Sequence, residues 1–112
     1  MKKTVKKLDN NVIKALTIVC EAFKDKEVGF EWLTHTADYA NFPGSLIVTC
    51  VFKSNIDLQN AKNNQVDIEI RTQIQKQLFK AGVLLKDAKR HVCFDTEEAC
   101  SAESDGNWKL RL

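Results

Sequence analysis

The segment SLIVTCVFK, residues 45–53, decides the predicted fold because it is the clearest β-strand in the chain. Its side chains alternate between two sides, which is the period of a strand. One side carries Leu46, Val48, Cys50 and Phe52. The opposite side carries Ile47, Thr49, Val51 and Lys53. We therefore expect residues 45–53 to lie in a sheet, with Cys50 in the core.

Two helices and three more strands are predicted around this segment. Apolar residues recur with the helical period over 10–26 and over 65–81, and both segments have capping residues near their ends. The second helix has two alternative starts, since Ser54 and the residues after it also resemble an N-cap. Strands are expected over residues 29–36, 89–95 and 107–112, and the acidic segment between the last two is expected to be a hairpin or loop.

The predicted order of elements is αββαββ. Two helices packed on one face of a four-stranded, largely antiparallel sheet would bury every apolar stripe, which is an α+β fold. The length of 112 residues fits one domain. We assign residues 9–112 to that domain and residues 1–8, which contain several lysines, to a basic N-terminal tail.

Composition narrows the class of protein. Apolar residues make up 44% of the chain and charged residues 29%, as in a folded globular domain, and the net charge of +2 gives no general attraction to nucleic acid or membranes. No stretch approaches the roughly 20 apolar residues of a membrane span. The four cysteines form no Cys-x-x-Cys pair. We expect a cytoplasmic protein with reduced thiols and no membrane partner.

One segment differs from the rest of the chain. Between residues 32 and 52 the only charged side chain is that of Asp38, and four aromatic residues lie there. A low content of charged residues together with a high content of aromatic residues is typical of the centre of an interface. The predicted binding residues are Trp32, His35, Asp38, Tyr39 and Phe42. For the loop at 34–43, an interface and a packed end of the core are both left open.

Few residues indicate chemistry. His35, His91 and the scattered thiols of Cys50, Cys93 and Cys100 have no metal-ligand spacing. We predict no metal, no cofactor and no catalytic residue. If 89–95 is a strand, the side chains of His91 and Cys93 share its open face about 6–7 Å apart, too far for a nucleophile and its base.

Nucleic-acid binding is one alternative function. Lys109 and Arg111 are predicted on the open face of the sheet, and residues 86–90 add a basic cluster. Few aromatics are expected there, since Trp32 and Trp108 are predicted to face inward. A one-residue bulge would reverse either tryptophan.

Protein binding fits more of the sequence. Besides the charge-depleted segment, Ile68 and Phe79 flank Thr72 and Gln75 on the side of the second helix opposite its core stripe. Packing inside the domain is the favoured explanation of this second apolar side, and docking on another molecule is the other. We predict a small protein-interaction or regulatory accessory domain that binds a protein or a second copy of itself. The alternatives are nucleic-acid binding and a small-molecule-binding or Cys/His-based enzyme.

Overall fold

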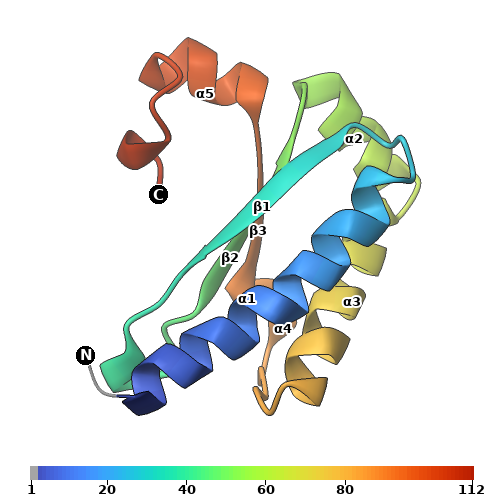
Figure 1. Ribbon diagram of the computed structural model, residues 1–112. Coiled ribbons are helices and arrows are strands. Elements are labelled where there is room, and N and C mark those ends of the chain that lie inside the picture. The colour runs from blue at the N-terminus through green and yellow to red at the C-terminus, as the bar shows by residue number, and fades with distance from the viewer. Residues whose placement is uncertain (1–2) are drawn as a thin grey trace.

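Strand β2, Ile47–Phe52, is the centre of the fold (Figure 1). Strand β1, Phe30–Thr36, pairs with it antiparallel, and β3, Val92–Thr96, pairs with it parallel on the other side. The structure is a computed structural model that describes residues 3–112. From Val48 to Phe52 every residue of β2 is buried. The strand that the sequence predicted most clearly is therefore the one enclosed on all sides.

The helices lie on both sides of this sheet. They are α1 (Lys3–Lys24), α2 (Asn55–Asn63), α3 (Val66–Lys80), α4 (Ala88–His91) and α5 (Glu97–Ser104), with 3-10 turns η1 (Tyr39–Asn41) and η2 (Trp108–Leu110). Figure 1 shows α1 and α3 together on one side of the sheet, and α5 with the C-terminal end on the other. In the part of the chain described, no helix is long and apolar enough to cross a membrane.

The main core lies between the sheet and helices α1 and α3. Fully buried apolar side chains from all three meet there: Val48, Cys50 and Phe52 of β2, Val12, Leu16, Val19 and Phe23 of α1, and Ile70, Ile74 and Leu78 of α3. Both helices thus use the apolar stripes that their sequences predicted. Cys50 is in the core, as expected.

The predicted four-stranded sheet with the order αββαββ is wrong. Within residues 3–112 the sheet has three strands, and the order of elements is αββαααβα. Residues 107–112, predicted as the fourth strand, contain η2, whose N-cap Asn107 accepts a hydrogen bond from the backbone N–H of Lys109. Leu110 is 71% exposed and Leu112 49% exposed. The alternation of apolar residues over so short a segment did not mark a buried face.

The acidic segment after β3 is a helix and not a hairpin. The Oγ1 atom of Thr96 accepts a hydrogen bond of 2.9 Å from the backbone N–H of Ala99, which caps the start of α5. Glu97 and Glu98 lie in the first turn, where negative charge interacts favourably with the helix dipole. These two acidic residues therefore stabilise the start of the helix, although the density of acidic residues over the segment suggested a solvated loop.

Other boundaries also differ from the sequence prediction, and the strand predicted over 89–95 begins only at Val92, after α4. Helix α1 begins at Lys3, so residues 3–8 of the predicted basic tail are helical, and residues 1 and 2 lie outside the described part. Both alternative starts of the second helix are used. Ser54 caps α2, and α3 follows after Gln65, whose φ of 62° reverses the chain between them.

A β-bulge in β1 determines which side chains face which layer. Phe30 pairs with Phe52, but Trp32 pairs with Val51, so Glu31 is one extra residue. From Trp32 onward the pattern is reversed. Leu33 and His35 share the face of β2 that meets the helices, and Trp32 lies on the opposite face. The prediction that Trp32 faces inward is therefore wrong.

The face of the sheet opposite α1 and α3 is partly covered by the C-terminal residues. The Glu97 carboxylate accepts hydrogen bonds from the indole nitrogens of Trp32 (3.0 Å) and Trp108 (2.9 Å). The two indole rings meet edge to face, with centroids 4.9 Å apart. Nearby, Arg111 donates two hydrogen bonds of 2.8 Å to Asp95. We call these five residues the C-terminal clasp.

The clasp makes a testable prediction about stability. Glu97→Ala removes the acceptor of both indole N–H groups and should lower the free energy of unfolding by about 1–3 kcal/mol. Because Trp32 and Trp108 are the chain's two tryptophans, their fluorescence emission should shift to longer wavelength in the folded variant. Urea unfolding followed by fluorescence measures both effects. Ser101→Ala, at an exposed site on the same helix, is the control and should leave both unchanged.

Candidate functional site

Two of the predicted binding residues contact one carboxylate on α1. The Nε2 atom of His35 lies 3.0 Å from Oδ1 of Asp9, and the Tyr39 hydroxyl donates a 2.5 Å hydrogen bond to the same oxygen. Because β1 is bulged, His35 faces α1 and can reach Asp9. The loop after β1 is therefore fastened to the first half of α1.

The other three predicted residues are placed differently. The ring of Phe42 lies 4.9 Å from that of Tyr39 and packs partly buried against the core. Asp38 is exposed and caps η1 by accepting a hydrogen bond from the backbone N–H of Ala40. Trp32 belongs to the C-terminal clasp on the opposite face. The structure thus brings His35, Tyr39 and Phe42 together, leaves Asp38 beside them at the surface, and separates Trp32 from all four.

Sequence reasoning missed Asp9 as a member of this group. The predicted helix starts at residue 10, but α1 begins at Lys3, so Asp9 lies inside the helix. Hydrogen bonds from Tyr39 and His35 lower the pKa of Asp9, while burial and the bond to Asp9 raise the pKa of Tyr39. These groups satisfy one another within the chain.

The histidine and cysteine side chains do not form a reactive site. His91 is buried in α4 and donates from Nδ1 to the carbonyl oxygen of Leu46 at 2.7 Å, so its predicted place on the open face of a strand is wrong. Cys93 is exposed and pairs in register with Thr49 on the opposite face from the helices. Burial raises the pKa of Cys50 to about 12. In residues 3–112 no three His, Cys, Asp or Glu side chains are grouped so as to hold a metal ion.

The outer side of α3 is the main feature without an intramolecular role. Ile68, Thr72, Gln75 and Phe79 follow one another along this side, and we call them the α3 track. Ile68 is 51% exposed and Phe79 65% exposed. The expectation that this second apolar side packs inside the domain is therefore wrong. A C-terminal strand does not form, and the C-terminal clasp holds that segment on the other side of the sheet.

The α3 track is bordered by an apolar hollow near the C-terminal end of the helix. This hollow has a volume of about 370 Å³, and Leu84, which is 61% exposed, forms one of its walls. Its lining residues are Thr72, Gln75, Lys76, Phe79, Leu84 and Leu85. Phe79 and Leu84 together offer an apolar contact surface next to the helix.

A second hollow, of about 570 Å³, lies between the α3 track and the start of α4. We call it the cationic hollow because Arg71, Lys86 and Lys89 contribute to its wall. The full lining is Ile68, Arg71, Thr72, Gln75, Lys86, Asp87, Ala88 and Lys89. Thr72 and Gln75 line both hollows, so the two are contiguous.

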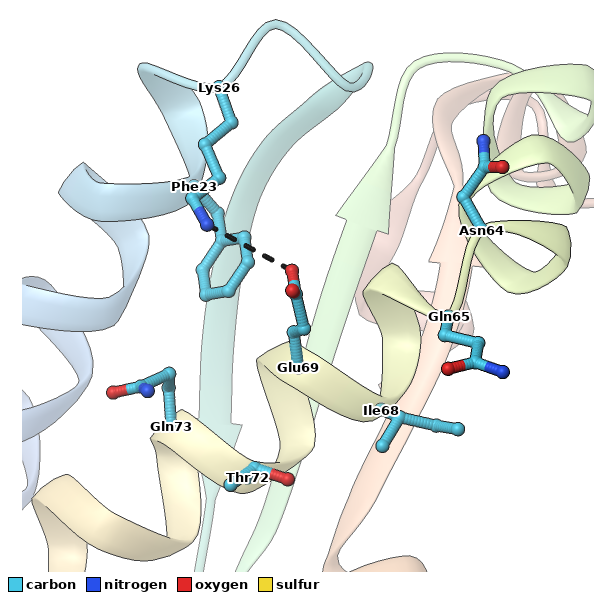
Figure 2. A pocket seen from close by; sticks show the side chains of 8 residues that line it. All are labelled: Phe23, Lys26, Asn64, Gln65, Ile68, Glu69, Thr72 and Gln73. Atoms are coloured by element: carbon cyan, nitrogen blue, oxygen red, sulfur yellow. Dashed lines mark ion pairs between the residues drawn. The ribbon is translucent and has the colours of Figure 1, made fainter.

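A third hollow, of about 310 Å³, meets the other end of the track (Figure 2). There the Nζ atom of Lys26, in the turn that follows α1, lies 3.9 Å from the Glu69 carboxylate, above the side chain of Phe23. Ile68 points away from this ion pair in Figure 2. Glu69 is thus paired with Lys26, which leaves the positive charges along α3 less compensated.

The charges around the α3 track are mainly positive. Residues 66–90 contain six basic and three acidic side chains. Within residues 3–112 the ion pairs join Lys26 to Glu69, His35 to Asp9, and Arg111 to Asp95 and Glu103. None of the basic side chains of residues 66–90 takes part in them. The guanidinium of Arg71 lies 5.6 Å from the Phe94 ring centroid, beside the cationic hollow.

The Asp9 cluster predicts a pH-dependent contribution to stability. The folded pKa of Asp9 lies below its ordinary value of 3.8, so its contribution is complete above that value and is lost as the pH falls through the lower folded pKa. Asp9→Asn should therefore reduce the free energy of unfolding near neutral pH, and this reduction should shrink as the pH falls below 3.8. Urea unfolding across this range measures the difference. A constant difference would contradict the assignment, and Asp25→Asn at an exposed site is the control.

The thiols should differ in reactivity. Cys93 is exposed, whereas Cys50 and Cys100 are buried, so iodoacetamide should modify Cys93 in the folded protein well before either of these. Mass spectrometry of tryptic peptides after short exposure measures the order. Rapid modification of Cys50 would show that the core opens at β2.

Comparison of the chain with family models, with curated proteins and with solved structures finds no match. A function must therefore be inferred from the chain's own surfaces.

Proposed function

We propose that this protein is a protein-interaction domain, with a regulatory or accessory role, that binds its partner through the α3 track. The observation that carries this proposal is the exposure of Ile68, Phe79 and Leu84 along one continuous hollowed surface. Single exposed apolar residues are normal on soluble proteins. Three that border contiguous hollows form a patch of the kind that partners cover.

The position of the track on its helix supports the proposal. Ile70, Ile74 and Leu78 already bury the opposite side of α3 in the core, so packing of the domain does not require Ile68 or Phe79 to be apolar. A large aromatic side chain at the surface is also a common anchor of binding. Contact with a partner accounts for both apolar sides of the helix.

The alternative functions have less support. The basic side chains of residues 66–90 would suit nucleic acid, but Phe79 is the one aromatic on the α3 track and could stack a single base. For Cys/His chemistry, His91 is bonded to Leu46 in the interior while Cys93 lies on the outer face of the sheet. We also propose a cytoplasmic location, which four free thiols favour.

The loop at 34–43 is a second candidate contact region. Of the predicted binding residues in this loop, Asp38 is exposed, whereas Tyr39 and Phe42 contact each other and either α1 or the core. Tyr39→Ala therefore distinguishes the two regions. If the α3 track is the contact surface, this substitution should destabilise the domain. The fraction of the variant that remains folded should still bind the partner.

The central prediction concerns Phe79→Ser. Because Phe79 is exposed and serine has a similar helix propensity, the free energy of unfolding should change by less than about 0.5 kcal/mol. Loss of an aromatic anchor should weaken partner binding by more than about 1 kcal/mol, or at least fivefold. Unfolding curves give the first value, and titration of the purified partner gives the second.

The partner is identified by affinity capture from lysate of the native cells, with and without nuclease, followed by mass spectrometry. The capture is run in parallel with the wild-type protein, with Phe79→Ser, and with the control Glu21→Ala at an exposed site on α1. A protein enriched in both nuclease arms by wild type and control, but lost with Phe79→Ser, supports the proposal once it rebinds as a purified protein. Enrichment that disappears with nuclease favours nucleic acid, and binding unaffected by Phe79→Ser rejects the α3 track.

A further inference from the structure

The chemistry of the partner can be inferred from the two contiguous hollows beside α3. A molecule that covers Phe79 and Leu84 in the apolar hollow also passes Thr72 and Gln75, which form the edge of the cationic hollow. The partner must therefore present apolar side chains and, next to them, groups that can bind the positively charged side chain of Arg71. Both requirements apply to one continuous segment.

The positive charges of the cationic hollow form no ion pair with the carboxylates of residues 3–112. Arg71, Lys86 and Lys89 line it with one carboxylate, that of Asp87. Oδ1 of Asp87 accepts a hydrogen bond from the backbone N–H of Lys89 as the cap of α4. No ion pair in residues 3–112 includes any of these three basic side chains. Carboxylates brought into this hollow would meet a net positive surface.

The apolar hollow favours a protein over a nucleic acid as the source of negative charge. Phosphate backbones interact with Lys and Arg but offer little to bury the side chains of Phe79 and Leu84, which are 65% and 61% exposed. An amphipathic helix supplies apolar residues on one side and charged residues beside them. It matches both hollows with one regular element.

We infer that the α3 track and its two hollows bind an acidic amphipathic helix of another protein, with apolar residues against Phe79 and Leu84 and Asp or Glu residues against Arg71, Lys86 and Lys89. This inference rests on the proposed function and adds the chemistry of the partner. Arg71 and Phe79 are eight residues apart on α3, or about 12 Å along the axis. The partner's acidic and apolar contacts should therefore lie about two helical turns apart.

The test uses three synthetic model helices of about 20 residues, long enough to form in solution, with one leucine stripe at helical spacing. They differ only in the residues that flank the stripe, which are Glu, Gln or Lys. Each peptide is titrated into isotopically labelled full-length protein, and amide chemical shifts are followed. The Glu peptide should shift residues 68–91 and bind at least about tenfold more tightly than the Lys peptide, with an affinity that falls as salt is added.

Charge-reversed variants locate the selectivity. Lys86→Glu with Lys89→Glu should remove or invert the preference for the Glu peptide, while the control Lys7→Glu with Lys14→Glu, at exposed sites on α1, should retain it. Phe79→Ser should weaken binding of the Glu and Gln peptides alike, because it removes the shared apolar contact.

The outcomes separate this inference from the proposed function. If the Gln and Glu peptides bind the α3 track equally well, the track binds protein but the partner is not acidic, and the inference fails alone. A preference for the Lys peptide, or shifts outside residues 68–91, overturns the inference. Shifts of the same residues on raising the protein concentration without peptide would assign the surface to a second copy. Absence of any shift would overturn both proposals.

Discussion

One extra residue in β1 sets the arrangement on both sides of the sheet. The bulge at Glu31 directs Leu33 and His35 toward α1 and Trp32 toward the opposite face. His35 then meets Asp9, and Trp32 meets Glu97 and Trp108. A strand without the bulge would exchange these faces and break both contacts. The attachment of the first loop to α1 and of the C-terminal segment to the sheet thus both depend on this irregularity.

The position of the C-terminal segment explains why one side of α3 stays uncovered. The clasp holds that segment against the face of the sheet that α1 and α3 do not occupy. The sheet and α1 bury Ile70, Ile74 and Leu78, and nothing in residues 3–112 covers Ile68 or Phe79 to the same extent. The exposed α3 track is therefore a consequence of the topology. Its positive border then favours one class of partner.

Sequence reasoning was reliable where a strong periodicity coincided with burial. Strands β1 and β2, the core stripes of α1 and α3, and the buried Cys50 were predicted from their side-chain patterns. It failed where local signals compete. The acidic residues after β3 suggested a loop, but Thr96 caps a helix there. The alternation over 107–112 is too short to identify a strand. The bulge leaves no mark in the pattern, so the partners of Trp32 and His35 could not be predicted. Ile68 and Phe79 stand out in the sequence as a second apolar side of their helix. Their exposure follows only from the structure, in which the predicted C-terminal strand does not form.

The most direct test places a photo-activated cross-linking amino acid at position 79 in the native cell and compares it with the same group at position 110. Both sites carry exposed apolar side chains, at 65% and 71%, but they belong to different surfaces. If α3 binds a partner, the group at position 79 should give one discrete cross-linked protein, and the group at position 110 should not. The segment of that protein that is cross-linked to position 79 should be rich in acidic residues. The same adducts from both positions, or none from position 79, would contradict a binding role for this surface.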